Sequence, residues 1–215
     1  MTLLNPPPPR PQRNLCSSVK SVGLPDVLKT GNTLAISDIS LIFAACNNKE
    51  RNRIMEDVVK IASYISQRYE HQYGTRIDEM KLHKLLYFTQ RECLVQLGEP
   101  MFGAKFKAWK YGPVILEIRQ HYKDNSLSFS LSRESLQKYQ GVFDKVFEQY
   151  APKQSWSLST LSHGEYSWKK AREGYSPYDT CDVDIDLSDI RKDAERINIR
   201  RFLLAQYKDF QMSRA

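Results

Sequence analysis

The chain lacks the long apolar runs and the cysteine spacing that define several protein classes. None of its 215 residues lies in an apolar stretch of the roughly 18 to 20 residues that a spanning helix requires. The best candidate, LAISDISLIFAAC at 34–46, is short and contains Asp38. PPPP at 6–9 stands where a signal peptide would have its apolar core. The four cysteines form no CxxC pair, so we expect free thiols and a cytoplasmic location.

Common catalytic and cofactor motifs are also missing. The sequence contains no GxxxxGK[ST] loop, no GxGxxG, no GxSxG and no HExxH. DVDID at 182–186 resembles the start of a calcium loop, but Leu187 stands where that loop needs glycine and Asp193 where it needs glutamate. The alternation of these residues is more typical of a half-buried strand. We therefore expect no cofactor, no bound metal and no enzymatic activity.

Charge gives little support to a nucleic-acid partner. The formal net charge is +7, from 32 Lys and Arg against 25 Asp and Glu. Residues 1–55 hold seven basic and three acidic residues, a net charge of +4, while residues 56–215 hold 25 and 22, a net charge of +3. More than half of the surplus therefore lies in the N-terminal quarter. A net charge of +3 over the remainder is too small to predict a phosphate-binding surface.

Residues 1–54 differ in composition from the rest of the chain. They contain PPPPRP at 6–11, which favours polyproline II, and then scattered Ser, Asn and Gly without a sustained period. An SH3-type ligand is one interpretation of the proline segment. The composition favours a disordered or weakly structured Pro-rich leader over residues 1–54.

From residue 55 the apolar residues repeat with a helical period. The first predicted helix ends at Gly74, the second is capped by Thr75 or Asp78 and ends at Gly98, and a later one is capped by Ser132. We also expect a helical segment over 158–172, interrupted near Gly164, and a last helix capped by Ser188. Cys93 lies on the apolar face of the second helix and is expected in the core.

Two short segments alternate like strands. FGAKFKAWKY at 102–111 predicts a strand or hairpin arm, and residues 182–187 predict another strand. Gly112 and Pro113 are expected to break the first strand, with Pro113 in the first turn of a helix that runs to about Lys123. The predicted fold is mainly α, with about six helices and one small β element, in a single compact domain over residues 55–210.

Three segments together resemble a known family. They are KLHKLLYFTQ at 81–90, GEPMF at 98–102 and FKAWKYGPVILEI at 106–118, followed by Leu161, Ser162, His163 and Trp168. This combination resembles the Panacea, or SocA-like, antitoxin domain, which is also found among phage-associated proteins. The resemblance covers about residues 55–205.

The resemblance implies binding rather than catalysis. Such domains neutralise co-encoded toxins by direct contact, and a SocA-like member instead delivers the toxin to a protease. The expected partners are therefore a cognate toxin and, in the alternative, a protease; the oligomeric state is left open. Gly112 and Pro113 would form a structural turn. The positions carried over as candidate partner-binding residues are Lys81, Lys84, Tyr87, Trp109, Tyr111, His163 and Trp168.

Lys84 and Tyr87 lie off the apolar stripe of their helix, so we expect them on a recognition surface.

A DNA-binding regulator is an alternative suggested by the basic residues over 191–201, although acidic residues interrupt them. An enzyme that uses His163 with Glu165 as an acid–base pair is a third, but no nucleophile accompanies them.

Overall fold

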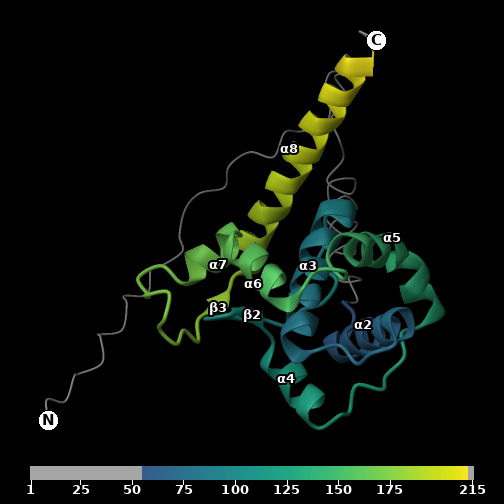
Figure 1. Cartoon of the computed structure of the whole chain (residues 1–215), viewed down its shortest axis with the longest axis vertical. Helices are drawn as coiled ribbons and strands as arrows, with labels where there is room; N and C mark the ends of the chain where they lie inside the picture. Colours follow the sequence, from purple (N-terminus) through teal and green to yellow (C-terminus); the bar gives the residue numbers. More distant parts are fainter. Residues whose placement is uncertain (1–54, 213–215) are drawn as a thin grey trace, which may run out of the picture. The chain divides into compact units, whose positions relative to one another are not determined.

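The computed structural model describes residues 55–212, except for the side chains of residues 208 and 209. The leader expected over residues 1–54 lies outside the described residues. The described part is one compact domain that is mainly helical, as predicted (Figure 1). Its elements are α2 (Val58–Tyr73), α3 (Glu79–Leu97), β1 (Phe106–Trp109), β2 (Gly112–Val114), α4 (Leu116–Lys123), α5 (Arg133–Gln149), α6 (Ser155–His163), α7 (Tyr166–Ala171), β3 (Asp184–Ile185) and α8 (Leu187–Met212).

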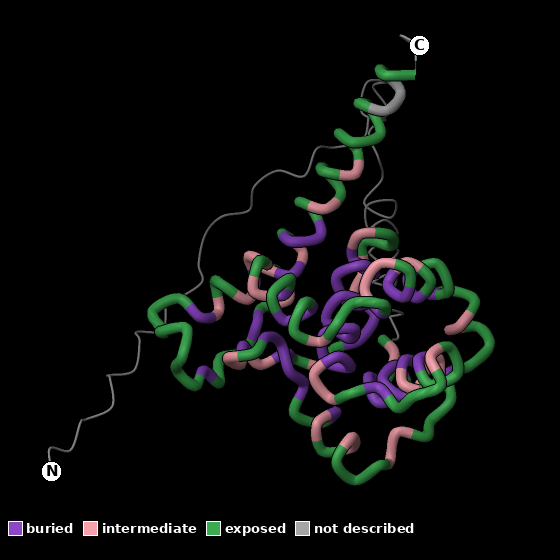
Figure 2. The backbone as a smooth tube through the Cα atoms, viewed as in Figure 1, coloured by how far each residue is buried: buried purple, intermediate pink, exposed green. Residues whose placement is uncertain are grey.

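Helix α3 is the centre of the domain. The Asp78 side chain caps it by accepting a hydrogen bond from the Lys81 backbone N–H at 2.9 Å, and Gly98 ends it at a φ of 70°. Helices α2, α4, α5, α6 and α8 and strand β2 all pack on α3, so every residue from 81 to 94 is buried (Figure 2). The expectation that Lys84 and Tyr87 face solvent is therefore wrong, because packing covers the polar face of this helix as well.

A small antiparallel sheet lies against this helix. The strand order is β2-β1-β3, and Ala108 pairs with Pro113 in the hairpin formed by β1 and β2. Gly112 and Pro113 were expected to end the strand, with Pro113 in the first turn of a helix. This expectation is wrong, because both residues belong to the returning strand β2. Pro113 fits there because β2 is an edge strand, where a missing N–H leaves no ladder bond unmade. Helix α4 begins only at Leu116, after Ile115.

The remaining helix limits follow local capping, with two corrections. Ser132 caps α5 as predicted, accepting from the Ser135 backbone N–H at 3.1 Å. The segment expected over 158–172 is interrupted near Gly164, as predicted, and forms α6 and α7, but α6 begins at Ser155 rather than at 158. Asp186 rather than Ser188 caps α8, because its carboxylate accepts from the Ser188 backbone N–H at 2.7 Å.

Helix α8 is packed along only part of its length. Its first turns bury Ile190 and Ala194 against α3 and α7, whereas its C-terminal half extends beyond the other helices and is exposed (Figures 1 and 2). Among residues 55–212, no helix combines the length and the hydrophobicity that crossing a bilayer requires.

Candidate functional site

A hollow of about 690 Å³ opens between α3, the β1–β2 hairpin, α4 and the segment before β3. Three of the predicted partner-binding residues, from two distant parts of the sequence, meet there. The residues that line it are Glu79, Met80, His83, Lys84, Trp109, Lys110, Tyr111, Val114, Arg119, Thr180, Cys181 and Asp182.

Trp109 forms one wall of the hollow and is held there by polar contacts. Its indole Nε1–H donates to the Asp182 carboxylate at 3.2 Å, and the Arg119 guanidinium lies 5.1 Å from the centre of a Trp109 ring. Burying an indole requires an acceptor for its N–H, and Asp182 supplies it. The ring is therefore fixed in position while remaining half-buried.

Lys84 reaches the hollow from α3, beneath the turn of the hairpin. Its side chain is 1% exposed, and its Nζ donates to the Pro113 carbonyl at 3.2 Å. Burial lowers the pKa of Lys84 to about 7, against the opposing effect of Asp78 and Glu79. No ion pair joins Lys84 to a carboxylate anywhere in the described part of the chain.

Gly112 makes this approach possible. Its φ of 103° lies in the region that L side chains rarely adopt. A Cβ at this position would also lie 2.5 Å from both Lys84 Cε and Ser162 Oγ. Position 112 therefore needs glycine for two reasons, its backbone conformation and the lysine packed beneath it.

His83 is the second buried polar side chain in the wall. It is 1% exposed, and its Nδ1 accepts a hydrogen bond of 3.4 Å from the Ile115 backbone N–H. This places the remaining proton of the neutral ring on Nε2, which has no hydrogen-bond partner. The Glu79 carboxylate lies 3.8 Å from His83 Nε2, and it is itself bound by Arg119 at 2.6 Å. Burial lowers the pKa of His83.

Exposed aromatic side chains stand at the edge of the hollow. Tyr111 contacts Trp156 edge to face at 5.3 Å, and Lys110 Nζ lies 5.1 Å from the Tyr111 ring and 5.7 Å from the Tyr178 ring. We call Tyr111, Trp156 and Tyr178 the aromatic rim. They are 47%, 62% and 81% exposed, respectively.

His163 and Trp168 support the hairpin from behind. Their rings stack at 4.1 Å, and Trp168 Nε1 donates to the Trp109 carbonyl at 3.1 Å. The Arg172 guanidinium also contacts the Trp168 ring and donates to the Ala108 carbonyl at 2.9 Å. These side chains therefore hold strand β1 in place and do not line the hollow.

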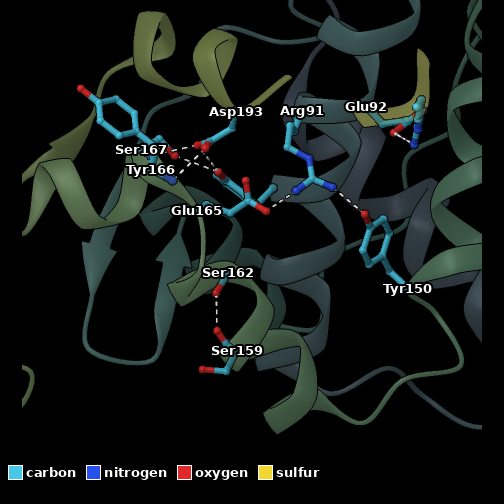
Figure 3. Close-up of polar contacts among 11 residues, drawn as sticks. Arg91, Glu92, Tyr150, Ser159, Ser162, Glu165, Tyr166, Ser167 and Asp193 are labelled. Atoms are coloured by element: carbon cyan, nitrogen blue, oxygen red, sulfur yellow. Dashed lines mark hydrogen bonds and ion pairs between the residues drawn. The ribbon is translucent and has the colours of Figure 1, made fainter. Parts of the chain in front are cut away.

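A buried polar network joins α3, α5, α7 and α8 (Figure 3). Arg91 lies between the Glu165 carboxylate and the Tyr150 hydroxyl, and Asp193 accepts from the backbone N–H groups of Tyr166 and Ser167 at 2.7 and 2.9 Å. Burial and the neighbouring Asp193 raise the pKa of Glu165 to about 7, against the effect of Arg91.

This network separates two residues that were considered as an acid–base pair. Glu165 faces Arg91 on α3, whereas His163 stacks on Trp168. Over the described residues, no group of three or more His, Cys, Asp and Glu side chains is placed to hold a metal ion. Within the DVDID segment, Asp182 and Asp184 contact Lys107, and Asp186 caps α8.

The predicted site residues thus fall into three groups. Lys84, Trp109 and Tyr111 line the hollow, and His163 and Trp168 support it. The remaining two are buried elsewhere: Lys81 Nζ donates to the Tyr69 hydroxyl at 2.9 Å, and the Tyr87 hydroxyl bonds to Ser167 and Asp193. Neither is accessible to a partner, because α3 is enclosed.

Sequence reasoning missed residues that line the hollow, His83 and Arg119 among them, and also Trp156 of the aromatic rim. His83 lies within the family motif but carries no spacing that marks a ligand. Trp156 stands alone in a polar segment, and its position beside Tyr111 depends on the packing of α6 against the hairpin. An exposed tryptophan at the start of a helix was the signal available.

Comparison with known proteins identifies the same part of the chain. Residues 82–169 match the family described as "Antitoxin SocA-like, Panacea domain", a segment that runs from α3 through the hairpin into α7. "Antitoxin SocA" of Caulobacter vibrioides (strain NA1000 / CB15N) is 35% identical over 57 residues, 26% of this chain and 30% of the relative. The alignment thus spans less than a third of that relative's length. No solved structure matches the chain. The match to the SocA-like Panacea antitoxin family is thus confined to residues 82–169, less than half of the chain.

Proposed function

We propose that this chain is an antitoxin that neutralises a co-encoded toxin by direct protein contact, through the hollow and its aromatic rim. The observation that carries the proposal is the exposure of Tyr111 and Trp156 beside the hollow, within the family segment. Tyr, Trp and Arg are the side chains that contribute most to protein interfaces, especially beside a pocket. Contact of this kind needs no cofactor and no catalytic group.

The contacts of the basic residues of α8 weaken the DNA-binding alternative. Arg201 binds the Glu92 carboxylate through both of its terminal nitrogens, and Lys192 pairs with Asp189 at 2.6 Å. Arg191 donates to the Gly98 carbonyl. Side chains engaged within the domain are not free to contact phosphates. A gel shift with the chain's own promoter at low salt tests this alternative.

Co-expression tests the proposed function. The product of the neighbouring gene is expressed in a bacterial host with and without this chain, and colony survival is measured. Rescue together with a complex of the purified proteins supports neutralisation by contact. A toxic neighbour that this chain neither binds nor neutralises contradicts it. Toxin abundance in the rescued cells separates two mechanisms, because delivery to a protease lowers it and occlusion does not.

The aromatic rim yields the first prediction. Truncating Trp156 to alanine removes a side chain that is 62% exposed, so the fold should be retained while toxin affinity falls roughly 30-fold, as at interface hot spots. Phe129→Ala is the matched control, because Phe129 is 46% exposed but lies in the segment before α5, away from the rim. Titration calorimetry with purified toxin measures both. Equal loss in the two variants would exclude the rim as the interface.

A further inference from the structure

The charges around the hollow are not balanced. Its lining contains the basic side chains Lys84, Lys110 and Arg119 and the acidic side chains Glu79 and Asp182. Both carboxylates already have basic partners, because Glu79 binds Arg119 at 2.6 Å and Asp182 lies 3.8 Å from the Lys107 ammonium outside the lining.

The two lysines are different. The Lys110 ammonium lies over two aromatic rings and forms no ion pair among the described residues, and the Lys84 side chain makes one hydrogen bond, to a carbonyl. The hollow therefore contains two lysine side chains that form no ion pair with a carboxylate within the described part of the chain.

The Lys84 side chain is buried, so N–H donors of its ammonium group that lack an acceptor in the protein are costly. An ammonium group has three N–H donors, and within residues 55–212 only the Pro113 carbonyl accepts from Lys84. The same wall holds His83, whose Nε2 is buried and has no hydrogen-bond partner. Buried donors without acceptors are rare in folded proteins, and each one calls for an explanation such as a ligand. On one wall of the hollow, His83 Nε2 has no acceptor and Lys84 Nζ has a single one, which indicates that the occupant of the hollow supplies acceptor oxygens.

The surroundings define the rest of the occupant. Trp109 and Val114 give the hollow apolar walls, and Tyr111 joins it to the exposed rim. Charge-assisted hydrogen bonds are stronger away from water, so an anionic group enclosed by these walls would be bound more strongly than on an open surface. A partner side chain that enters from the rim would bury its stem against the rings and present its tip to α3.

We infer that the hollow receives an acidic side chain of the toxin, whose carboxylate pairs with the Lys84 ammonium while its stem packs on Trp109. This inference rests on the proposed function and names the chemistry of its partner. The toxin would present an Asp or Glu among apolar residues on the surface that it offers to this chain.

A small carboxylate tests the inference without the toxin. Phenylacetate has a ring for the apolar walls and a carboxylate for Lys84, and phenylacetamide has nearly the same shape without the charge. The full chain is titrated with each compound while NMR follows the Trp109 indole N–H. We expect phenylacetate to shift this resonance saturably and to bind roughly tenfold more tightly than the amide, as charged hydrogen bonds imply.

The variants exploit a matched pair of buried lysines. Lys84→Met keeps the apolar stem and removes the ammonium, and should abolish the preference for the acid. Lys81→Met removes a buried ammonium from the same helix, but Lys81 bonds to Tyr69 away from the hollow, so this variant should bind like wild type. Lys84→Gln retains a donor for the Pro113 carbonyl and serves if the methionine variant does not fold. Circular dichroism and thermal melts confirm folding.

The results separate failure of this inference from failure of the proposed function. Wild type that binds phenylacetate no better than the amide, or not at all, overturns the inference whether or not the chain neutralises a toxin. So does a Lys84 variant with unchanged preference.

With purified toxin, the Lys84 variant should bind at least roughly tenfold more weakly than wild type. Equal toxin affinity in wild type and the Lys84 variant contradicts the inference and leaves the antitoxin role intact. Loss of binding in the Lys81 variant to the same extent would also contradict it, because the effect would not belong to the hollow.

Discussion

Gly112 and Lys84 are packed so closely that a side chain larger than that of glycine at position 112 would overlap with the lysine. The glycine adopts a φ of 103°, and the lysine stem lies where a Cβ on the glycine would be. The hairpin turn and the buried ammonium therefore depend on one another. At the scale of single residues, the sequence thus places a glycine directly over a lysine that forms no ion pair with a carboxylate among the described residues.

Replacing Gly112 by alanine tests this dependence. The new Cβ would meet Lys84 and Ser162 at 2.5 Å and would hold a strained φ, so we expect a loss of about 3 kcal/mol of unfolding free energy. Gly174→Ala is the matched control, because its φ of 89° is similarly strained but nothing lies within 4 Å. The control should lose only about 1 kcal/mol. Urea unfolding measures both, and equal losses would show that the contact with Lys84 has no energetic effect.

Among the elements, α8 is attached to α3 beyond its first turns by the Arg201–Glu92 ion pair and by a hydrogen bond from the Asn198 amide to the Val95 carbonyl at 3.3 Å. Arg201 donates to both oxygens of Glu92 on α3, at 2.8 and 2.9 Å, and the Glu92 side chain is fully buried. A bidentate pair of this kind fixes orientation as well as distance. The exposed end of α8 is thereby anchored to the most buried helix of the domain.

Arg201→Met should therefore be costly. It leaves the Glu92 carboxylate buried with only the Gln96 amide as a recorded donor, and an unpaired buried charge costs about 3 kcal/mol. Adding Glu92→Gln to this variant should recover much of that loss. Arg191→Met, which removes one exposed hydrogen bond to the Gly98 carbonyl, is the control and should cost less than about 1 kcal/mol. Thermal unfolding decides, and equal effects of the two arginines would contradict the anchor.

The elements also show what sequence reasoning can and cannot reach. The limits of α3 and α5 could be predicted because Asp78, Ser132 and Gly98 act on their own helix ends. The burial of Lys84 could not, since it depends on α6 and the hairpin, both distant in sequence. The strand at Gly112 was missed for a related reason: a Gly-Pro pair ends a strand by local rules, but here β1 supplies a partner for the returning edge.

Across the whole domain, one network sets the response to pH. Glu165, Arg91 and Asp193 join α3, α7 and α8, and Tyr150 adds the end of α5. Glu165 has a raised pKa, so the folded state binds a proton that the unfolded state releases. Stability from this group is therefore present below its ordinary pKa of 4.5 and is lost as the pH rises toward about 7.

A comparison of wild type with Glu165→Gln isolates this effect. Over the interval from pH 4.5 to pH 7 the wild type should lose about 3 kcal/mol relative to the variant, whose amide does not titrate. His83, whose pKa is lowered by burial, is present in both proteins and contributes equally to each. Glu148→Gln, at an exposed position on α5, should run parallel to wild type. Denaturant unfolding at a series of pH values gives the difference, and a constant difference would contradict the raised pKa.

All three tryptophans of the chain lie at or near the hairpin and the hollow. Trp109 forms a wall, Trp156 belongs to the rim, and Trp168 braces the strand from behind. Indole emission depends on the polarity around the ring, so intrinsic fluorescence of this protein originates beside the proposed interface. The domain thus carries its own optical reporter: covering the exposed Trp156 would shift emission to shorter wavelength, and occupancy can be followed in solution without any attached label.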